Sequence, residues 1–262
     1  MSGLKTSQAV DVQVRTRGQV PHGAGFYAQE KVLAAVGHVG EPVLAVQVKL
    51  TQAVNTSTHR PATAQAVVNV NGRPVRAHVA ASTMFEAVDL LQERLTARLA
   101  RARRHGQRGS GPNAQAWWDG PGHEHRPHRH HLPAEERRVV RRKSFSLARQ
   151  TPEDALIDLE AMDRDFWVFT DLVSGHDSVI YREVRTGRHR MASLGPLGQE
   201  REIDGVLGVS TVPVPKSTVA EAVSRLEHTG LPFVFFNDEA TGRGSVLYHR
   251  YDGHYGLITP SR

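Results

Sequence analysis

The second half of the chain contains an internal repeat at an offset of 67 residues, without a gap. The matched pairs are Thr151 and Thr218, Ala155 and Ala222, Leu159 and Leu226, Glu160 and Glu227, Phe166 and Phe233, Phe169 and Phe236, Asp171 and Asp238, Gly175 and Gly242, Ser178 and Ser245, Val179 and Val246, and Tyr181 and Tyr248. Agreement at one fixed offset indicates a duplicated unit rather than shared composition. The two copies must therefore fold alike, and a chain of 262 residues has room for a further domain before them.

Each copy predicts a small α+β domain with one order of elements: an opening strand, a short helix, and two strands joined by a turn. The opening strands are predicted at 144–147 and 211–214, the turns at Ser174-Gly175 and Thr241-Gly242, and the last strands end at Tyr181 and Tyr248. The first repeat is assigned to residues 142–195 and the second to residues 206–262.

Residues 1–105 predict a separate N-terminal domain with the order β-α-β-β-β-α. Its strands are expected at 10–14, 43–50, 64–70 and 74–80, and its first helix at 22–39. Asn71-Gly72 between the last two strands is a strong hairpin signal. Ser82 or Thr83 can cap the last helix, whose apolar stripe consists of Met84, Val88, Leu91, Leu95 and Leu99.

Residues 106–141 are rich in Gly, Pro, His and Arg and lack apolar periodicity, which is typical of a flexible basic linker. The pair Trp117-Trp118 interrupts it. Two interpretations of this pair stay open: a docking element for a partner, or a locally collapsed stretch of linker.

The composition favours a polyanionic partner. Lys and Arg number 33 against 27 Asp and Glu, a formal charge of +6, and most of the cations are arginine, which grips phosphate and stacks on bases. Nucleic acid is the leading candidate and an anionic membrane the second, although codon bias in a GC-rich genome produces the same excess of arginine. The absence of cysteine is consistent with a reducing compartment, by default the cytoplasm. No stretch approaches the roughly 20 apolar residues of a membrane-spanning helix, so no membrane role is expected.

The strongest nucleic-acid signal is on the last helix of the N-terminal domain. Arg94, Arg98 and Arg101 fall at i, i+4 and i+7 and share one face, and Arg103 and Arg104 are expected to continue the charge past its end. Such a face can grip phosphates. The alternative is a solvated helix end whose cations complement the helix dipole. The cations between Arg137 and Lys143 either contact RNA or keep the linker solvated.

No residues predict catalysis or a resident metal. The histidines His123, His125, His128, His130 and His131 lack the carboxylate or cysteine that would complete a closed ligand set, and a flexible linker does not preorganise them. Nucleophile-elbow, phosphate-loop, Rossmann and metalloprotease patterns are all missing. The expectation is a protein that is not an enzyme and has no cofactor and no small-molecule substrate.

The chain resembles the ribosome hibernation-promoting factors in two places. The hairpin at 72–77 with the helix at 84–95 is similar to their N-terminal domain, and the segments at 233–238, 246–250 and 252–260 resemble the C-terminal domain of the long form. The resemblance is closest to the mycobacterial dormancy-associated members, which carry that C-terminal domain twice.

The resemblance implies an N-terminal fold like that of double-stranded-RNA-binding domains, wedged into the small ribosomal subunit at the decoding region. There it would block mRNA and tRNA and inhibit translation under stress or dormancy. The implied partners are the 30S subunit and the 70S ribosome, through 16S rRNA and possibly ribosomal proteins. The candidate rRNA-binding residues are Arg94, Arg98, Arg101, Arg103, Arg104, Lys49, Arg73, Arg76, His78 and Lys31.

Two departures from the family weaken parts of this set. The family has Glu-Arg-Gln-Leu where this chain has Thr96-Ala97-Arg98-Leu99, which moves the guanidinium by one position. The family's first helix is typically rich in lysine, whereas the predicted helix at 22–39 retains only Lys31. Lys49, Arg73, Arg76 and His78, on or beside strands expected next to the last helix, would widen its basic surface.

In the long form, one C-terminal domain per chain pairs with that of another chain and joins two ribosomes into a 100S dimer. Here two copies are linked by a short connection, 195–208, at an effective concentration on the order of millimolar, so pairing within one chain is expected. The predicted pairing residues are Phe166, Val168 and Tyr181 of the first copy with Phe233, Phe235 and Tyr248 of the second, because related units reuse one self-complementary patch.

The expected result of pairing within one chain is a hibernating 70S monomer. The alternatives are a 100S dimerising factor and a general RNA-binding or RNA-chaperone protein. The copies have also diverged, because cations in Gly187–Leu194 of the first copy are predicted to replace the apolar strand that ends the second.

Overall fold

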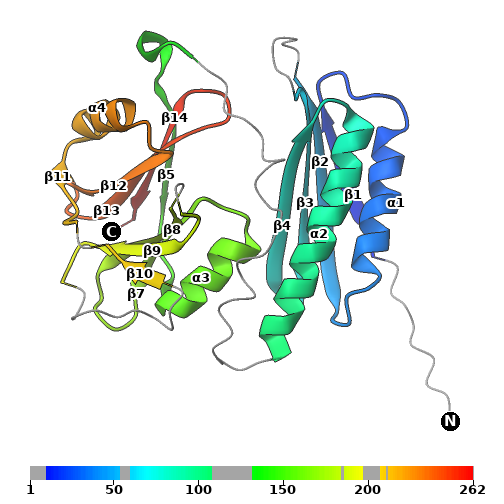
Figure 1. Ribbon diagram of the computed structural model, residues 1–262, viewed down its shortest axis with the longest axis horizontal. Coiled ribbons are helices and arrows are strands. Elements are labelled where there is room, and N and C mark those ends of the chain that lie inside the picture. The colour runs from blue at the N-terminus through cyan, green and yellow to red at the C-terminus, as the bar shows by residue number, and fades with distance from the viewer. Residues whose placement is uncertain are drawn as a thin grey trace. The chain divides into compact units, whose positions relative to one another are not determined.

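The computed structural model describes residues 10–53, 60–107, 132–183, 186–196, 207–210 and 212–261. The chain divides into two compact units: an N-terminal unit and a tail that contains both repeats (Figure 1). The histidine run and the Trp117-Trp118 pair lie outside the described residues.

The N-terminal unit is a four-stranded sheet with two helices on one face (Figure 1). Its elements are β1 (Val12–Arg17), α1 (Ala24–Val36), β2 (Val43–Gln52), β3 (Ala62–Val70), β4 (Arg73–Ala81) and α2 (Met84–Gln107). The strands lie in the order β1-β2-β3-β4, with β1 parallel to β2 and the other neighbours antiparallel. The predicted order of elements is confirmed.

Alternation along the strands determines which face is buried. Val46, Val48 and Leu50 on β2 are at most 1% exposed and pack with Leu91 and Leu95 of α2, whereas Gln47 and Lys49 are exposed. Because α1 crosses from the end of β1 to the start of β2, it permits these two strands to run parallel. The sheet therefore has one apolar face under the helices and one polar face.

The local signals at the β3–β4 turn and at the start of α2 are confirmed. Asn71 and Gly72 have φ of 48° and 87°, the left-handed values of a two-residue hairpin. At the start of α2, the Thr83 hydroxyl accepts a hydrogen bond from the Glu86 N–H at 3.2 Å, and the Glu86 carboxylate accepts one from the Thr83 N–H. This reciprocal capping makes Thr83 the cap.

The end of α2 was predicted too early. The helix continues to Gln107, so Arg103 and Arg104 lie within it rather than past its end. Alanine and arginine, which are among the strongest helix formers, occupy residues 100–104, and no breaker intervenes before Gly106. The first two residues of the predicted linker, 106–107, are therefore helical.

The tail contains two five-stranded sheets, each with one helix. Its elements are the short 3-10 helix η2 (Ala134–Glu136), β5 (Val139–Phe145), β6 (Arg149–Gln150), α3 (Pro152–Ala161), β7 (Phe166–Asp171), β8 (Asp177–Arg182), β9 (His189–Ser193), β10 (Leu207–Val209), β11 (Lys216–Ser217), α4 (Val219–Thr229), β12 (Phe233–Asp238), β13 (Gly244–His249) and β14 (Tyr255–Pro260). From β6 to β9, each element has a counterpart 67 residues later, within one residue at its ends.

The two sheets exchange their first strands. The sheet orders are β10-β9-β8-β7-β6 and β11-β12-β13-β14-β5. Strand β5 opens the first repeat but pairs in parallel with β14 of the second, and β10 opens the second repeat but pairs in parallel with β9 of the first. Each sheet is thus completed by a strand from the other half of the tail.

The exchange corrects the predicted opening strands. Residues 144–147 are not a separate strand: Ser144 and Phe145 end β5, and the strand beside β7 is β6 at 149–150. In the second repeat the corresponding strand is β11 at 216–217. Pro213, inside the predicted strand at 211–214, has no N–H to donate to a ladder. Since β5 begins at Val139, the linker also ends before the predicted residue 141.

The two faces of each tail sheet have different apolar partners. Trp167, Phe169 and Ile180 pack with α3, and Val234, Phe236 and Leu247 pack with α4. The intervening residues point to the opposite face and form one further cluster that draws on both sheets. The tail is thus layered as helix, sheet, sheet, helix, and the central cluster joins the repeats.

The first repeat retains its last strand although that segment contains cations, so the prediction that the strand is lost is wrong. Residues 189–193 form β9, which pairs with β8 and β10. His189 is only 3% exposed, and its Nε2 lies 2.8 Å from the Glu160 carboxylate. The carboxylate supplies a partner for a polar side chain that burial would otherwise penalise.

A substitution at Gly256 of β14 tests the packing of Tyr248 in the tail. It lies opposite Tyr248, and a Cβ at this position would lie 2.4 Å from the Tyr248 ring. We expect Gly256→Ala to displace the ring and lower the free energy of unfolding of the tail by about 1–3 kcal/mol, measured by urea denaturation. Gly208→Ala in β10 is the control, because its Cβ would meet nothing closer than 3.8 Å. Equal midpoints for the two variants would contradict this packing.

Candidate nucleic-acid interface and repeat-pairing surface

The arginines of α2 lie along one flank of that helix. Arg94, Arg98 and Arg101 follow the same helical spacing. Arg98 is buried, with 9% of its surface exposed, and both Arg94 and Arg98 donate to the carboxylate of Asp163, which clusters with this unit. Arg103 is exposed but lies two residues beyond Arg101, on a different face of the helix. The opposite flank carries Asp89, whose carboxylate accepts a hydrogen bond from Tyr27 of α1 at 2.7 Å. The arginine stripe therefore faces away from α1, toward the side of the sheet where β4 is the edge strand. The backbone of Arg104 continues the same helix.

The basic residues on the strands occupy the other face of the sheet. Lys49, Gln65 and His78 are direct cross-strand neighbours on the polar face, and Arg76 donates to Gln65 Oε1 at 3.0 Å. The prediction that these residues extend the helix surface is corrected: strand alternation turns Lys49, Arg76 and His78 away from the helix layer. Arg73 is exposed at the hairpin end of β4.

Lys31 has a structural partner. Its Nζ lies 2.9 Å from the Asp89 carboxylate and 5.1 Å from the centroid of the Tyr27 ring. Contact with Asp89, and then with Tyr27, raises the pKa of Lys31 above its ordinary value. The residue thus bridges α1 and α2 on the helix side of the sheet, apart from Lys49.

Sequence reasoning missed two arginines on the polar face. Arg15 pairs with Lys49 across the parallel β1–β2 ladder, and Arg17 pairs with Thr51; both arginines are exposed. Together with Gln65 and His78, Arg15 and Lys49 form a row that crosses all four strands. The alternation of residues 12–17 contained this signal, but the register with β2 was needed to place Arg15 beside Lys49.

The six residues proposed for repeat pairing lie in one apolar cluster, the central cluster of the tail. Phe166 of the first repeat lies 4.8 Å from Phe233 and 5.6 Å from Tyr248, between ring centroids. Tyr181 lies 5.5 Å from Phe233, edge to face. Val168 and Phe235 belong to the same cluster, whose fully buried members include Val179 and Val246.

An ion pair between a buried carboxylate and a half-buried arginine borders this cluster. Asp177 at the start of β8 is 5% exposed, and its carboxylate accepts hydrogen bonds from Arg243 Nε at 2.7 Å, Arg243 Nη2 at 3.0 Å and the Gly244 N–H at 2.9 Å. Burial alone would raise the pKa of Asp177. The hydrogen bonds from Arg243 and Gly244 lower it by more than burial raises it, so the pKa lies below its ordinary value. In these hydrogen bonds the first repeat supplies the accepting carboxylate, and the second repeat supplies all of the donors named here.

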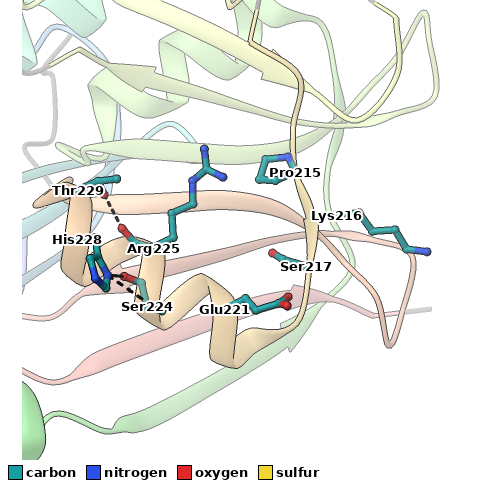
Figure 2. Close-up of a pocket in the computed structure, with 8 residues that line it drawn as sticks. All are labelled: Pro215, Lys216, Ser217, Glu221, Ser224, Arg225, His228 and Thr229. Carbon is teal, nitrogen blue, oxygen red and sulfur yellow. Dashed lines mark hydrogen bonds between the residues drawn. The ribbon is translucent and has the colours of Figure 1, made fainter.

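A shallow hollow lies between α4 and β11, and it shows no catalytic arrangement (Figure 2). Glu221 is committed to capping α4, because it accepts hydrogen bonds from the Thr218 N–H and hydroxyl. His228 Nδ1 lies 2.6 Å from the Ser224 carbonyl oxygen of its own helix (Figure 2). The polar groups of this hollow therefore serve local structure.

Among the described residues, no group of three or more His, Cys, Asp or Glu side chains is arranged to hold a metal ion. None of the described helices is long and apolar enough to cross a membrane.

Both repeats match a known protein family. Residues 134–187 and 203–257 each match the family model described as "Sigma 54 modulation/S30EA ribosomal protein C terminus". Each repeat is therefore similar to this C-terminal domain, and the two matches together cover less than half of the chain. Each match includes the exchanged strand, β5 or β10, so each S30EA C-terminal domain gives its first strand to the other.

Relatives of the chain include a "Dormancy associated translation inhibitor" from Mycobacterium tuberculosis, 43% identical over 143 residues. That match covers 52% of this chain and 52% of the relative, so it spans about half the length of each protein. A "Ribosome hibernation promotion factor" from Bradyrhizobium diazoefficiens is 33% identical over 70 residues, which cover 24% of this chain and 34% of that protein. The resemblance to hibernation factors inferred from the sequence is confirmed.

Among solved structures, the N-terminal domain of Thermus thermophilus Protein Y matches with a TM-score of 0.29 and 18% identity, covering 35% of this chain and 96% of that one.

The ion pair between the two S30EA domains predicts a pH-dependent stability. Because the folded-state pKa of Asp177 is below its ordinary value, its contribution is fully present above about pH 4 and is lost as the pH falls through the folded-state pKa. We expect Asp177→Asn to lower the urea midpoint of the tail at pH 7, and the difference from the parent to shrink steadily below about pH 4. Asp11→Asn, which removes one exposed charge in the N-terminal unit, is the control. A difference that stays constant with pH would contradict the ion pair's role.

Proposed function

We propose that this chain is a cytoplasmic ribosome hibernation factor that inhibits translation by occupying the ribosome, without catalysis. Its N-terminal unit binds 16S rRNA of the small subunit at the decoding region, where it excludes mRNA and tRNA. Because its tail pairs within one chain, the factor does not join two ribosomes, and the silenced ribosome stays a 70S monomer. The inducing condition is stress or dormancy, as the name of the mycobacterial relative suggests.

The observation that carries the proposal is the tail. Two S30EA C-terminal domains occur in one chain and pack on each other through the central cluster. That cluster buries the apolar sheet faces that a single domain would leave open for another chain. A tail closed in this way favours monomeric ribosomes over joined pairs.

The N-terminal unit supplies the basic surfaces that a ribosomal partner requires. The α2 stripe and the polar-face row are both built on regular secondary structure, so their cations are held at fixed spacing, as contacts to successive phosphates require. Within the stripe, Arg94 and Arg98 would exchange the Asp163 carboxylate for a phosphate on binding. The order β-α-β-β-β-α with both helices on one face supports the likeness to double-stranded-RNA-binding domains, which read RNA through shape and backbone.

Salt dependence tests the α2 stripe. Replacing Arg94, Arg98 and Arg101 with alanine removes up to three phosphate contacts, which should flatten the slope of log affinity against log salt by roughly 3 units and weaken 30S binding. Cosedimentation at several salt concentrations measures it. Alanine at Arg149, Arg188 and Arg225, exposed cations of the tail, is the charge-matched control and should leave the slope unchanged. An unchanged slope in the α2 variant would exclude the stripe.

The polar-face row is a separate arm of the same measurement. Arg15→Ala with Lys49→Ala removes two neighbouring cations from the opposite side of the sheet. We expect the slope to fall by roughly 2 units if this face contacts rRNA. Binding that is equally strong to unrelated RNA and to 30S subunits would instead identify a general RNA-binding protein.

Sedimentation distinguishes the two ribosomal outcomes. We expect sucrose gradients of ribosomes saturated with the full chain to show a 70S peak, because the pairing surface of the tail is occupied within one chain. A dominant 100S peak would show that the chain joins ribosomes, and the 70S part of the proposal would then be wrong.

A further inference from the structure

The pseudo-symmetry of the tail places two different residues at one equivalent position. Asp177 and Gly244 are separated by the repeat offset of 67 and lie against each other. The Gly244 N–H donates to the Asp177 carboxylate at 2.9 Å, and a Cβ on Gly244 would lie 2.8 Å from the Asp177 Cβ. A side chain at position 244 would therefore displace the carboxylate that its own repeat binds.

The neighbouring position is also asymmetric. Arg243 donates to Asp177 with two nitrogens and to the Ser261 carbonyl oxygen with Nη1 at 2.9 Å. Its counterpart in the first repeat is His176, which has a smaller side chain and is not permanently charged. The second repeat alone therefore contributes the bidentate donor, and the first repeat alone contributes the carboxylate.

A third pair differs in size. Val168 in the first repeat corresponds to Phe235 in the second, and both belong to the central cluster. The Phe235 ring occupies the space above Gly244, because a Cβ there would lie 2.8 Å from two of its ring atoms. Phe235 and Gly244 are thus matched within the second repeat, as Val168 and Asp177 are within the first.

We propose that the tail repeats form a heterotypic pair, in which Val168, His176 and Asp177 of one repeat recognise Phe235, Arg243 and Gly244 of the other, and in which neither repeat pairs well with a copy of itself. This inference goes beyond the ribosomal role and does not depend on it. It also revises the expectation of a self-complementary patch, because the shared aromatic residues are symmetric but their border is not.

The cost of like pairing follows from the contacts. Two first repeats would bring two Asp177 carboxylates together at a buried position without Arg243, and buried like charges are strongly unfavourable. Two second repeats would oppose two arginines without a carboxylate and would duplicate Phe235 within the same space. The partner of each repeat is consequently the opposite repeat, in the same chain or in a second copy of the chain.

Introduced cysteines report the pairing, because the chain has none of its own. Ser144 of β5 and Thr259 of β14 are neighbours in the exchanged ladder. Adjacent strands lie about 5 Å apart, within the range of a disulfide. In a chain with Ser144→Cys and Thr259→Cys, a disulfide within one chain reports pairing in cis, and a covalent dimer on a non-reducing gel reports pairing between chains.

Three sets of substitutions in this background test the rule. The first gives repeat one the residues of repeat two: Val168→Phe, His176→Arg and Asp177→Gly. The second gives repeat two the residues of repeat one: Phe235→Val, Arg243→His and Gly244→Asp. The third combines all six and so restores a heterotypic pair in the reverse direction.

We expect each one-sided variant alone to form the disulfide at least about tenfold more slowly than the parent, because one member of the pair then lacks its partner at a border where the carboxylate is buried. The combined variant should recover the rate of the parent. Mixing the two one-sided variants should yield a disulfide-linked heterodimer that neither forms alone, because each then finds its complement in the other chain. This gain does not arise from simple misfolding.

Two results would overturn the proposal. One is a one-sided variant that forms the disulfide within its own chain as fast as the parent. The other is the absence of recovery, both in the combined variant and in the mixture.

Discussion

The exchange of β5 and β10 is the constraint on which the tail depends. Without β5, β14 would be an open edge of its sheet, and without β10, β9 would be one. An open edge exposes unpaired backbone groups and invites pairing with another chain. Because each edge is covered by the other repeat, separating the repeats would break two parallel ladders and open the central cluster as well. Closure of the backbone and burial of the apolar face are therefore one event.

Much of this fold was predictable because its signals are local. The Asn71-Gly72 hairpin, the capping of α2 and the apolar stripe of α2 are each readable within one short segment, and the structure contains all of them. The repeat needs only a comparison of the chain with itself at one fixed offset. The aromatic residues of the central cluster were also predictable, because Phe166, Tyr181, Phe233 and Tyr248 recur in both copies and a duplicated apolar surface has a duplicated use.

The features that could not be predicted depend on contacts between distant segments. The cations Arg141, Arg142 and Lys143 are typical of a solvated linker, yet they lie in β5, because Gly256, Leu257 and Ile258 offer backbone partners 115 residues later in the chain. Arg15 meets Lys49 only once β1 and β2 are known to be parallel and in register. Lys49, Arg76 and His78 were assigned to the wrong face of the N-terminal sheet for a related reason. The order of the strands is easier to infer from sequence than the face to which each side chain points.

The two copies show how a duplicated site can diverge without loss of its fold. Glu160 and Glu227 are equivalent carboxylates at the ends of α3 and α4. Glu160 contacts His189 and Arg182, whereas Glu227 accepts a hydrogen bond from the Tyr255 hydroxyl at 2.8 Å. Both arrangements tie the helix to its sheet. The first repeat could therefore accept a histidine in its last strand, because a carboxylate was already in place to satisfy it.

Pairing within one chain also changes how the tail responds to concentration. Association between chains weakens on dilution, whereas the fraction of tails closed in cis is independent of the amount of protein. The heterotypic border strengthens this distinction, because it removes like-with-like pairing as a competing state. A tail built in this way is closed to the same extent whether the protein is scarce or abundant, so under the proposed function only the binding of the N-terminal unit would respond to the amount of protein.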